Sequence, residues 1–104
     1  MASGILGQSA PTANTNTTVY TVPALTTSTF SVSICNTGIA TIVARLAIAA
    51  SATPGASEYL EYDALIPANG VLERTGIVAQ AAKLVVVRVS STTAAVSIFG
   101  FEEV

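Results

Sequence analysis

The chain has 104 residues, of which 51% are hydrophobic and only 10% are charged, whereas an ordinary soluble domain is about 25% charged. One domain is expected at this length, and so apolar a small chain suggests that partners cover part of its surface. Six acidic and four scattered basic residues give a net charge of −2, which argues against a nucleic-acid surface and against attraction to an anionic membrane.

No targeting segment is evident at the start of the chain. The first residues contain no basic stretch followed by an apolar one, so we expect no secretory signal and synthesis in the cytoplasm. The longest apolar run, residues 39–50, contains Arg45 and is shorter than the roughly 20 residues that a membrane-spanning helix needs.

The N-terminal part of the chain is polar. Residues 11–18 consist largely of threonine and asparagine, so we expect residues 1–18 to form an extended arm or loop. A folded domain is expected at residues 19–104. Its first short strand covers residues 19–22 and ends at Pro23, because proline cannot donate to a strand ladder.

Residues 29–35 alternate cleanly between apolar and polar side chains, as a half-buried strand does. The apolar face consists of Phe30, Val32 and Ile34. A turn at residues 36–38 contains Asn and Gly, which tolerate positive φ. The spacing in residues 39–49 fits a strand or a helix, and we favour a strand joined to the preceding one as a hairpin.

The second half of the chain also reads as short strands separated by turn signals. In residues 58–66 the expected inward side chains are Leu60, Tyr62, Ala64 and Ile66, and the outward ones are Tyr59, Glu61 and Asp63. Further strands are expected at residues 71–74, 77–82, 83–90 and 94–102, with a bulge or bend at Gly76 and a hairpin loop at 67–70. The class is all-β: a single small antiparallel β-sandwich or jelly roll of seven or eight strands built on hairpins.

No catalytic or cofactor-binding pattern stands out. The chain has no histidine, so Ser–His and Cys–His pairs are impossible, and its glycines do not form a phosphate-binding loop. Glu61 and Asp63, two residues apart on one strand face, would lie about 7 Å apart, a separation that an inverting glycosidase also uses. Any such pair has this spacing, so we favour a solvated or ion-paired face over a calcium site or catalysis and expect neither enzyme activity nor a cofactor.

Cysteine and tyrosine side chains allow two interpretations each. Cys35 is the only cysteine, which excludes an intrachain disulfide and leaves a small buried hydrophobe, which we favour, or an intermolecular bridge. The three tyrosines, Tyr20, Tyr59 and Tyr62, can stack on sugars, but we favour core or half-buried strand positions for them.

Residues 84–87 are the most informative segment. The sequence Leu-Val-Val-Val does not alternate, which indicates a strand buried on both faces. One face belongs to the core; the other is the middle of an oligomer interface or lies under a loop, and we favour the interface. Arg45 and Arg88 would pair with Glu61 or Asp63 at its rim. The candidate interface residues are Val43, Arg45, Glu61, Asp63, Leu84, Val85, Val86, Val87 and Arg88.

From residue 19 onward the chain resembles a family of small virion structural proteins of tailed phages, cyanophages among them. The phrases that carry the resemblance, in chain order, are VYTVPA (19–24), ICN (34–36), RLAI (45–48), EYLEYDALIPANGVLERTGI (58–77) and VSIFGFEE (96–103). One departure is at residues 79–83, where a glycine would be expected before the next strand. The resemblance implies a β-sandwich without catalytic residues.

The resemblance and the composition together lead to a functional hypothesis. We expect a non-enzymatic virion protein, a capsid decoration (cement) protein that acts through oligomer contacts and its N-terminal arm. Its partners would be further copies of itself, as a dimer or trimer, and the major capsid protein. The alternative is a tail, baseplate or fibre component that binds a host-surface glycan or receptor.

Overall fold

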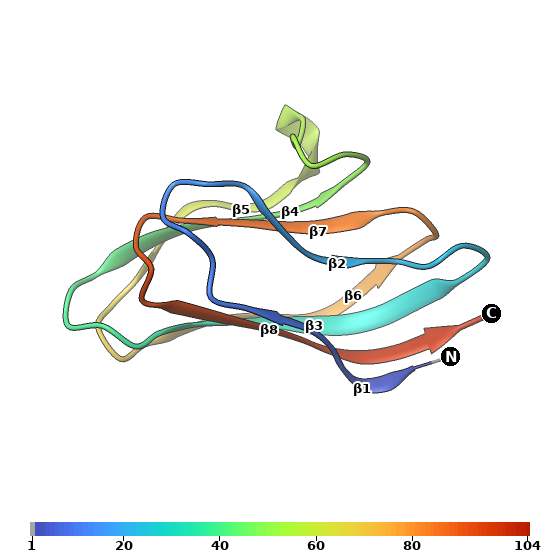
Figure 1. The fold of residues 1–104 in the computed structure, drawn as a ribbon, viewed down its shortest axis with the longest axis horizontal. Helices are drawn as coiled ribbons and strands as arrows, with labels where there is room; N and C mark the ends of the chain where they lie inside the picture. The colour runs from blue at the N-terminus through green and yellow to red at the C-terminus, as the bar shows by residue number, and fades with distance from the viewer. Residues whose placement is uncertain (1) are drawn as a thin grey trace.

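A computed structural model describes residues 2–104 as two four-stranded antiparallel sheets that pack face to face (Figure 1). The strands are β1 (Ser3–Ser9), β2 (Thr17–Thr21), β3 (Thr27–Asn36), β4 (Ile42–Ala49), β5 (Tyr59–Ile66), β6 (Val71–Ala79), β7 (Leu84–Val89) and β8 (Ala94–Glu103), with one short 3₁₀ helix, η1 (Ala56–Glu58). None of the described residues belongs to a helix long and apolar enough to cross a membrane.

We name the sheets by their places in Figure 1. The lower sheet has the strand order β1-β8-β3-β6, and the upper sheet has the order β2-β7-β4-β5. The chain pairs as nested antiparallel couples, β1 with β8, β2 with β7, β3 with β6 and β4 with β5. Eight strands wound in this way form a jelly roll, which confirms the predicted all-β sandwich.

The two predicted hairpins, at residues 36–38 and 67–70, are wrong. The turns at residues 36–38 and 67–70 carry the chain from one sheet to the other, because β3 and β6 belong to the lower sheet and β4 and β5 to the upper one. Within residues 2–104, β4 and β5 are the only consecutive strands that pair with each other. A turn signal shows where a chain reverses but does not specify which strand it then pairs with.

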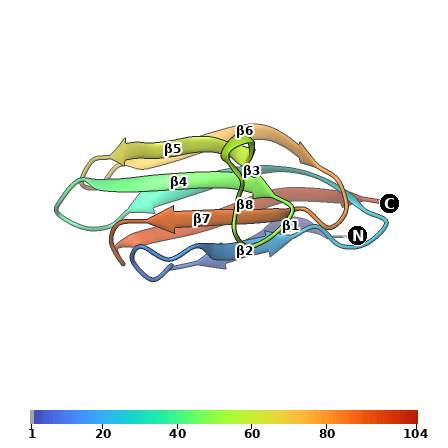
Figure 2. The same cartoon turned by 90° about the horizontal axis from the view of Figure 1, so that it is seen from above.

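The expected N-terminal arm of residues 1–18 is wrong at residues 3–9. Ser3–Ser9 forms β1, which pairs with β8 at the edge of the lower sheet (Figure 2). A Cβ at Gly7 would collide with the carbonyl oxygen of Val19, so the close approach of β1 to the start of β2 requires glycine here. The two glycines of β1 weaken its strand pattern in the sequence, which is why it reads as irregular.

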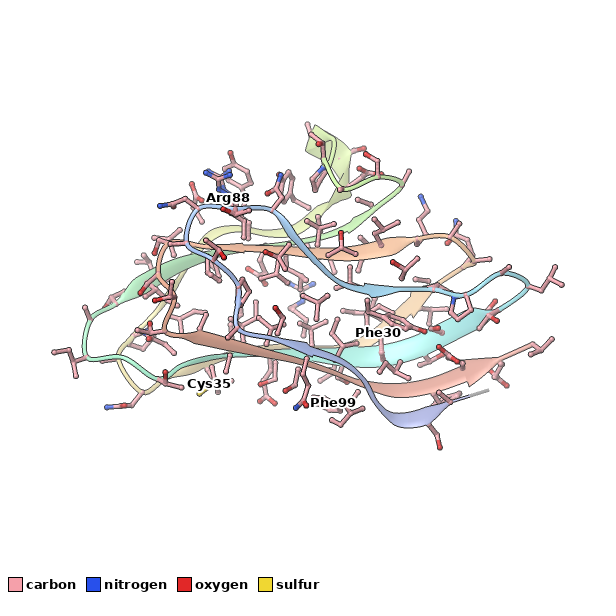
Figure 3. All side chains as sticks on the ribbon, in the orientation of Figure 1. Phe30, Cys35, Arg88 and Phe99 are labelled. Carbon is pink, nitrogen blue, oxygen red and sulfur yellow. The ribbon has the colours of Figure 1, made fainter. Side chains whose placement is uncertain are left out.

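Alternate side chains of the strands fill one core between the sheets. Phe30, Val32 and Ile34 are buried on the inward face of β3, as predicted. Figure 3 shows Phe30 pointing into the space between the sheets, where its ring meets that of Tyr20 edge-to-face at 6.0 Å. Burial of a side chain of this size contributes roughly 1.5–3 kcal/mol.

The expected bulge at Gly76 is confirmed. The register of β6 against β3 shifts between Phe30 and Val32, and Gly76 has a φ of +69° in the same part of β6. The strands predicted at residues 71–74 and 77–82 are therefore one strand, β6, which ends at Ala79. The extra residue is accommodated by the left-handed conformation that glycine adopts readily.

A fully buried asparagine holds one end of the sandwich together. Asn36 is 0% exposed at the end of β3. Its amide nitrogen donates to three carbonyl oxygens, those of Ala40, Ile66 and Pro67, at 2.7, 3.1 and 3.2 Å. Its amide oxygen accepts from the N–H of Gly38 and from the hydroxyl of Thr93, each at 3.0 Å. One side chain thus connects the ends of β3, β5 and the β7–β8 turn.

A tyrosine and a glutamate form a polar link toward the opposite end. The Tyr20 hydroxyl donates to a carboxylate oxygen of Glu102 and lies 2.6 Å from the buried Ser28 hydroxyl. Burial, together with the hydrogen bond to Glu102, raises the pKa of Tyr20, and the same hydrogen bond lowers the pKa of Glu102. This link joins β2 of the upper sheet to β3 and β8 of the lower one.

We predict that Asn36→Ala destabilises the protein by about 2–3 kcal/mol, because it leaves buried carbonyl oxygens and a buried N–H without a partner. Urea unfolding followed by circular dichroism measures this loss. The matched control is Asn16→Ala, at a loop position whose side chain makes none of the hydrogen bonds described for residues 2–104. Equal effects of the two substitutions would contradict the role assigned to Asn36.

Candidate interaction surfaces

The outward faces of the two sheets are the candidate functional surfaces, and they differ in chemistry. In the part of the chain that the structure describes, no three His, Cys, Asp or Glu side chains come together as metal ligands. Figure 3 places Arg88 above the upper sheet, and Cys35 and Phe99 below the lower one. We call these two surfaces the upper face and the lower face.

A bulge in β5 shapes the upper face. Ala44 pairs with Ala64, but Leu46 pairs with Glu61, so two residues of β5 stand opposite the single residue Arg45 of β4. These two residues are Tyr62 and Asp63, and Asp63 has a φ of +55°. The bulge therefore turns both side chains toward the arginine.

Arg45 engages both of its neighbours in the bulge. Its Nε lies 2.7 Å from Oδ1 of Asp63, and its guanidinium carbon lies 4.1 Å from the centre of the Tyr62 ring. The ion pair lowers the pKa of Asp63 and raises the pKa of Arg45. Tyr62 also meets Tyr59 edge-to-face at 5.0 Å. The stacked arginine and the two rings make a preformed polar and aromatic patch.

A groove of about 410 Å³ lies beside this patch on the upper face. The residues that line it are Asn14, Val43, Arg45, Asp63, Leu65, Arg88, Val89 and Ser90. Arg45 and Arg88 stand directly opposite each other on β4 and β7. No carboxylate of residues 2–104 pairs with Arg88, so the groove carries one arginine whose charge is not neutralised by a contact.

The structure brings together four of the predicted interface residues and separates the others. Val43, Arg45, Asp63 and Arg88 all line the groove. Glu61 does not join them, because its carboxylate binds Arg74 of β6 at 2.6 Å and bridges the open edge between the two sheets.

Tyr62 was expected in the core, and that prediction is wrong. Its side chain is 58% exposed, because the bulge in β5 breaks the strict alternation on which the prediction depended. Tyr20, in contrast, is buried as expected.

Residues 84–87 are buried on both faces, as predicted, but not as an interface. Val85 and Val87 belong to the core between the sheets, and Val86, on the outward side, is only 2% exposed. The connection of residues 50–58 passes over β7 on this side (Figures 1 and 2). The placement of these valines on an oligomer interface is therefore wrong: Val85 and Val87 lie in the core, and a loop of the same chain covers the outward side. Leu84 is half-buried at the start of the strand.

Glu58 fastens this covering loop. Its carboxylate accepts the N–H of Gly55 at 2.7 Å and the N–H of Ala50 at 3.0 Å. The hydrogen bond from Gly55, followed by that from Ala50, lowers the pKa of Glu58. One side chain thus ties both ends of the loop together above the upper sheet.

The lower face carries exposed apolar side chains. Ile5 of β1 stands beside Phe99 of β8, and Phe101 stands two residues further along. The exposed fractions of these three side chains are 57%, 37% and 45%. The other exposed apolar residues of the face are Val71 and Val78 of β6. None of these residues belongs to the predicted interface, although the alternation of Phe99 and Phe101 with Ile98 and Gly100 indicates a strand with an apolar outward face.

Small uncharged side chains separate the apolar residues of the lower face. The outward residues of β3 are Thr29, Ser31, Ser33 and Cys35, and they pair with Phe101, Phe99, Ser97 and Ala95 of β8. Cys35 is half-buried here, less enclosed than the small core residue expected. Glu73, opposite Ser33, brings a charge to the edge strand of the face.

The carboxylates of the acidic pair at residues 61 and 63 are both ion-paired. Each carboxylate binds a different arginine, and Arg45 lowers the pKa of Asp63. The ion-paired interpretation of this strand is the one that the structure supports.

Comparisons with known protein families, with curated proteins and with solved structures find no match for this chain.

We predict that the loop of residues 50–58 loosens when the Glu58 carboxylate is lost. Because the pKa of Glu58 is lowered in the folded protein, its hydrogen bonds are intact above the ordinary glutamate value and are lost as the pH falls through the lower folded value. Glu58→Ala should have the same effect at neutral pH, seen as faster hydrogen exchange at the amides of Ala50 and Gly55. Glu103→Ala is the control, and unchanged protection in Glu58→Ala would refute the assignment.

Proposed function

We propose that this protein is a non-enzymatic structural component of a phage virion, a capsid decoration protein. It binds the major capsid protein and further copies of itself, as a dimer or trimer, and resides in the virion after synthesis in the host cytoplasm. It does not act through an N-terminal arm, because residues 3–9 of that segment form β1 of the lower sheet.

The observation that carries the proposal is the apolar lower face. Ile5, Phe99 and Phe101 are exposed next to one another on a sheet that bears few charges. A contiguous exposed apolar surface of this kind on a small protein marks a contact with another macromolecule. A building block that is permanently assembled has such a surface, whereas a free monomer is less soluble because of it.

Two further arguments support the proposal. The jelly roll is used widely in viral capsid proteins and also in lectins, which is an analogy of fold and not of function. The resemblance of residues 19–103 to small phage virion proteins is an argument from sequence phrases. Of the four basic residues, Arg45 and Arg74 are already paired with carboxylates, which favours a protein partner over a nucleic acid.

The test of the proposal is the amount of the protein in purified particles of the phage that encodes it. Quantitative mass spectrometry against the major capsid protein should find a fixed ratio, with hundreds of copies per particle for a capsid location. A small fixed number would instead indicate the tail. Particles without a stoichiometric amount of the protein would refute the virion role.

A second candidate function is supported by the groove of the upper face. The groove joins Arg88 and Asn14, and Tyr62 stands beside it on Arg45. Aromatic rings next to converging polar groups suit the binding of a sugar. A tail or fibre component that binds a host-surface glycan would use this groove. Saturable binding on a glycan array that Arg88→Ala abolishes would favour this function, and a lack of saturable binding would remove it.

A further inference from the structure

We infer that the lower face is a self-association surface whose partner is the lower face of a second copy of this chain, with Phe99 at its centre. The inference rests on the proposed structural role and names the surface that performs it. It replaces the predicted interface on residues 84–87, which the chain's own loop covers (Figures 1 and 2).

The register of the strands arranges the lower face in rows. One row consists of Ile5, Phe99 and Ser31, and the next of Ser3, Phe101, Thr29 and Val78. β8 and β3 are the two inner strands of the sheet, so Phe99 lies away from both edges. Figure 3 shows its side chain pointing away from the sandwich. A central aromatic side chain surrounded by smaller groups is typical of the residues that dominate binding energy.

The chemistry of the face suits an identical partner. A symmetric dimer requires a surface that complements itself. Hydroxyl groups such as those of Ser31 and Thr29 both donate and accept hydrogen bonds, so two copies of the same hydroxyl can pair. The rows of Phe99 and Phe101 contain no charged side chain, and the row on the other side of Phe99, with Gln8, Ser97 and Ser33, has its one charge at Glu73. Glu73 lies on the edge strand β6 and Glu103 at the end of β8, so association would bury no charge at the centre.

The size of the face also agrees with a stable dimer. The Cα atoms extend over 41 × 27 × 20 Å. Figure 1 is viewed down the shortest axis and shows both sheets edge-on, so the faces of the sheets extend along the 41 Å and 20 Å axes. Their product, about 800 Å², outlines the whole face, so an interface of standard size, which buries about 800 Å² per partner, would use most of it.

Sedimentation equilibrium on the purified full-length protein tests the inference. We expect a reversible dimer with a Kd in the micromolar range or tighter. Phe99→Lys should raise this Kd by at least about 30-fold, since it removes a central anchor and introduces a charge. The matched control is Leu65→Lys, which places the same charge on a 71% exposed residue of the upper face and should leave the Kd unchanged. Circular dichroism and the urea midpoint verify that both variants are folded.

Cys35 provides an independent measurement, because the sole cysteine of the chain lies on this face. The rate of its reaction with a maleimide should fall as the concentration of the wild-type protein rises through the Kd. In Phe99→Lys the rate should not depend on protein concentration.

The inference would be overturned by a wild-type protein that stays monomeric up to about millimolar concentration, which is far above the Kd of standard-size interfaces. It would also be overturned by a dimer that Phe99→Lys leaves intact, or by one that Leu65→Lys disrupts. These failures are distinct from failure of the virion role, which is decided by the copy number in particles. A monomer present at hundreds of copies would retain the role and remove this interface.

Discussion

The core between the two sheets takes alternate side chains from each strand, because successive residues of a strand point to opposite faces. Once Phe30 and Ile34 are inside, Ser31 and Cys35 must be outside, and the same holds for Ile98 inside and Phe99 outside. The closure of this single core therefore decides which residues form the two outward faces. The chemistry of each outward face is therefore that of the residues that alternate with the core residues along the strands.

Bulges are the points at which this alternation is broken, and they explain the composition of the upper face. In β5 the extra residue places both Tyr62 and Asp63 opposite Arg45, so an arginine that would otherwise face one neighbour has an ion pair and an aromatic ring. In β6 the bulge at Gly76 allows a single strand to follow β3 along its length. Both bulges interrupt regular pairing locally, and the one in β5 also brings a second side chain to Arg45.

The sequence was sufficient for the fold class and for most strand positions, because binary patterning reports burial directly. It was insufficient for pairing: the turn after Asn36 looks the same whether the next strand lies beside β3 or in the other sheet. Likewise, the unbroken apolar run at residues 84–87 indicates burial on both faces but does not identify the cover, which here is the loop held by Glu58. Four of the nine predicted site residues meet in the groove, because alternation along a strand predicts which residues share a face. The bulge that brings Tyr62 beside them cannot be predicted from that alternation.

The low charge of the chain has a structural explanation in the way its few charges are used. Two carboxylates bind arginines, that of Glu58 fastens the covering loop, and that of Glu102 accepts from Tyr20 at the end of the sandwich. The two ion pairs cancel within the chain, and the Glu58 and Glu102 carboxylates, which keep their charge, are held above the upper sheet and at the end of the sandwich. The lower face is left with hydroxyl groups and exposed apolar side chains at its centre, and hydrophobic association is the interaction that such a surface favours most.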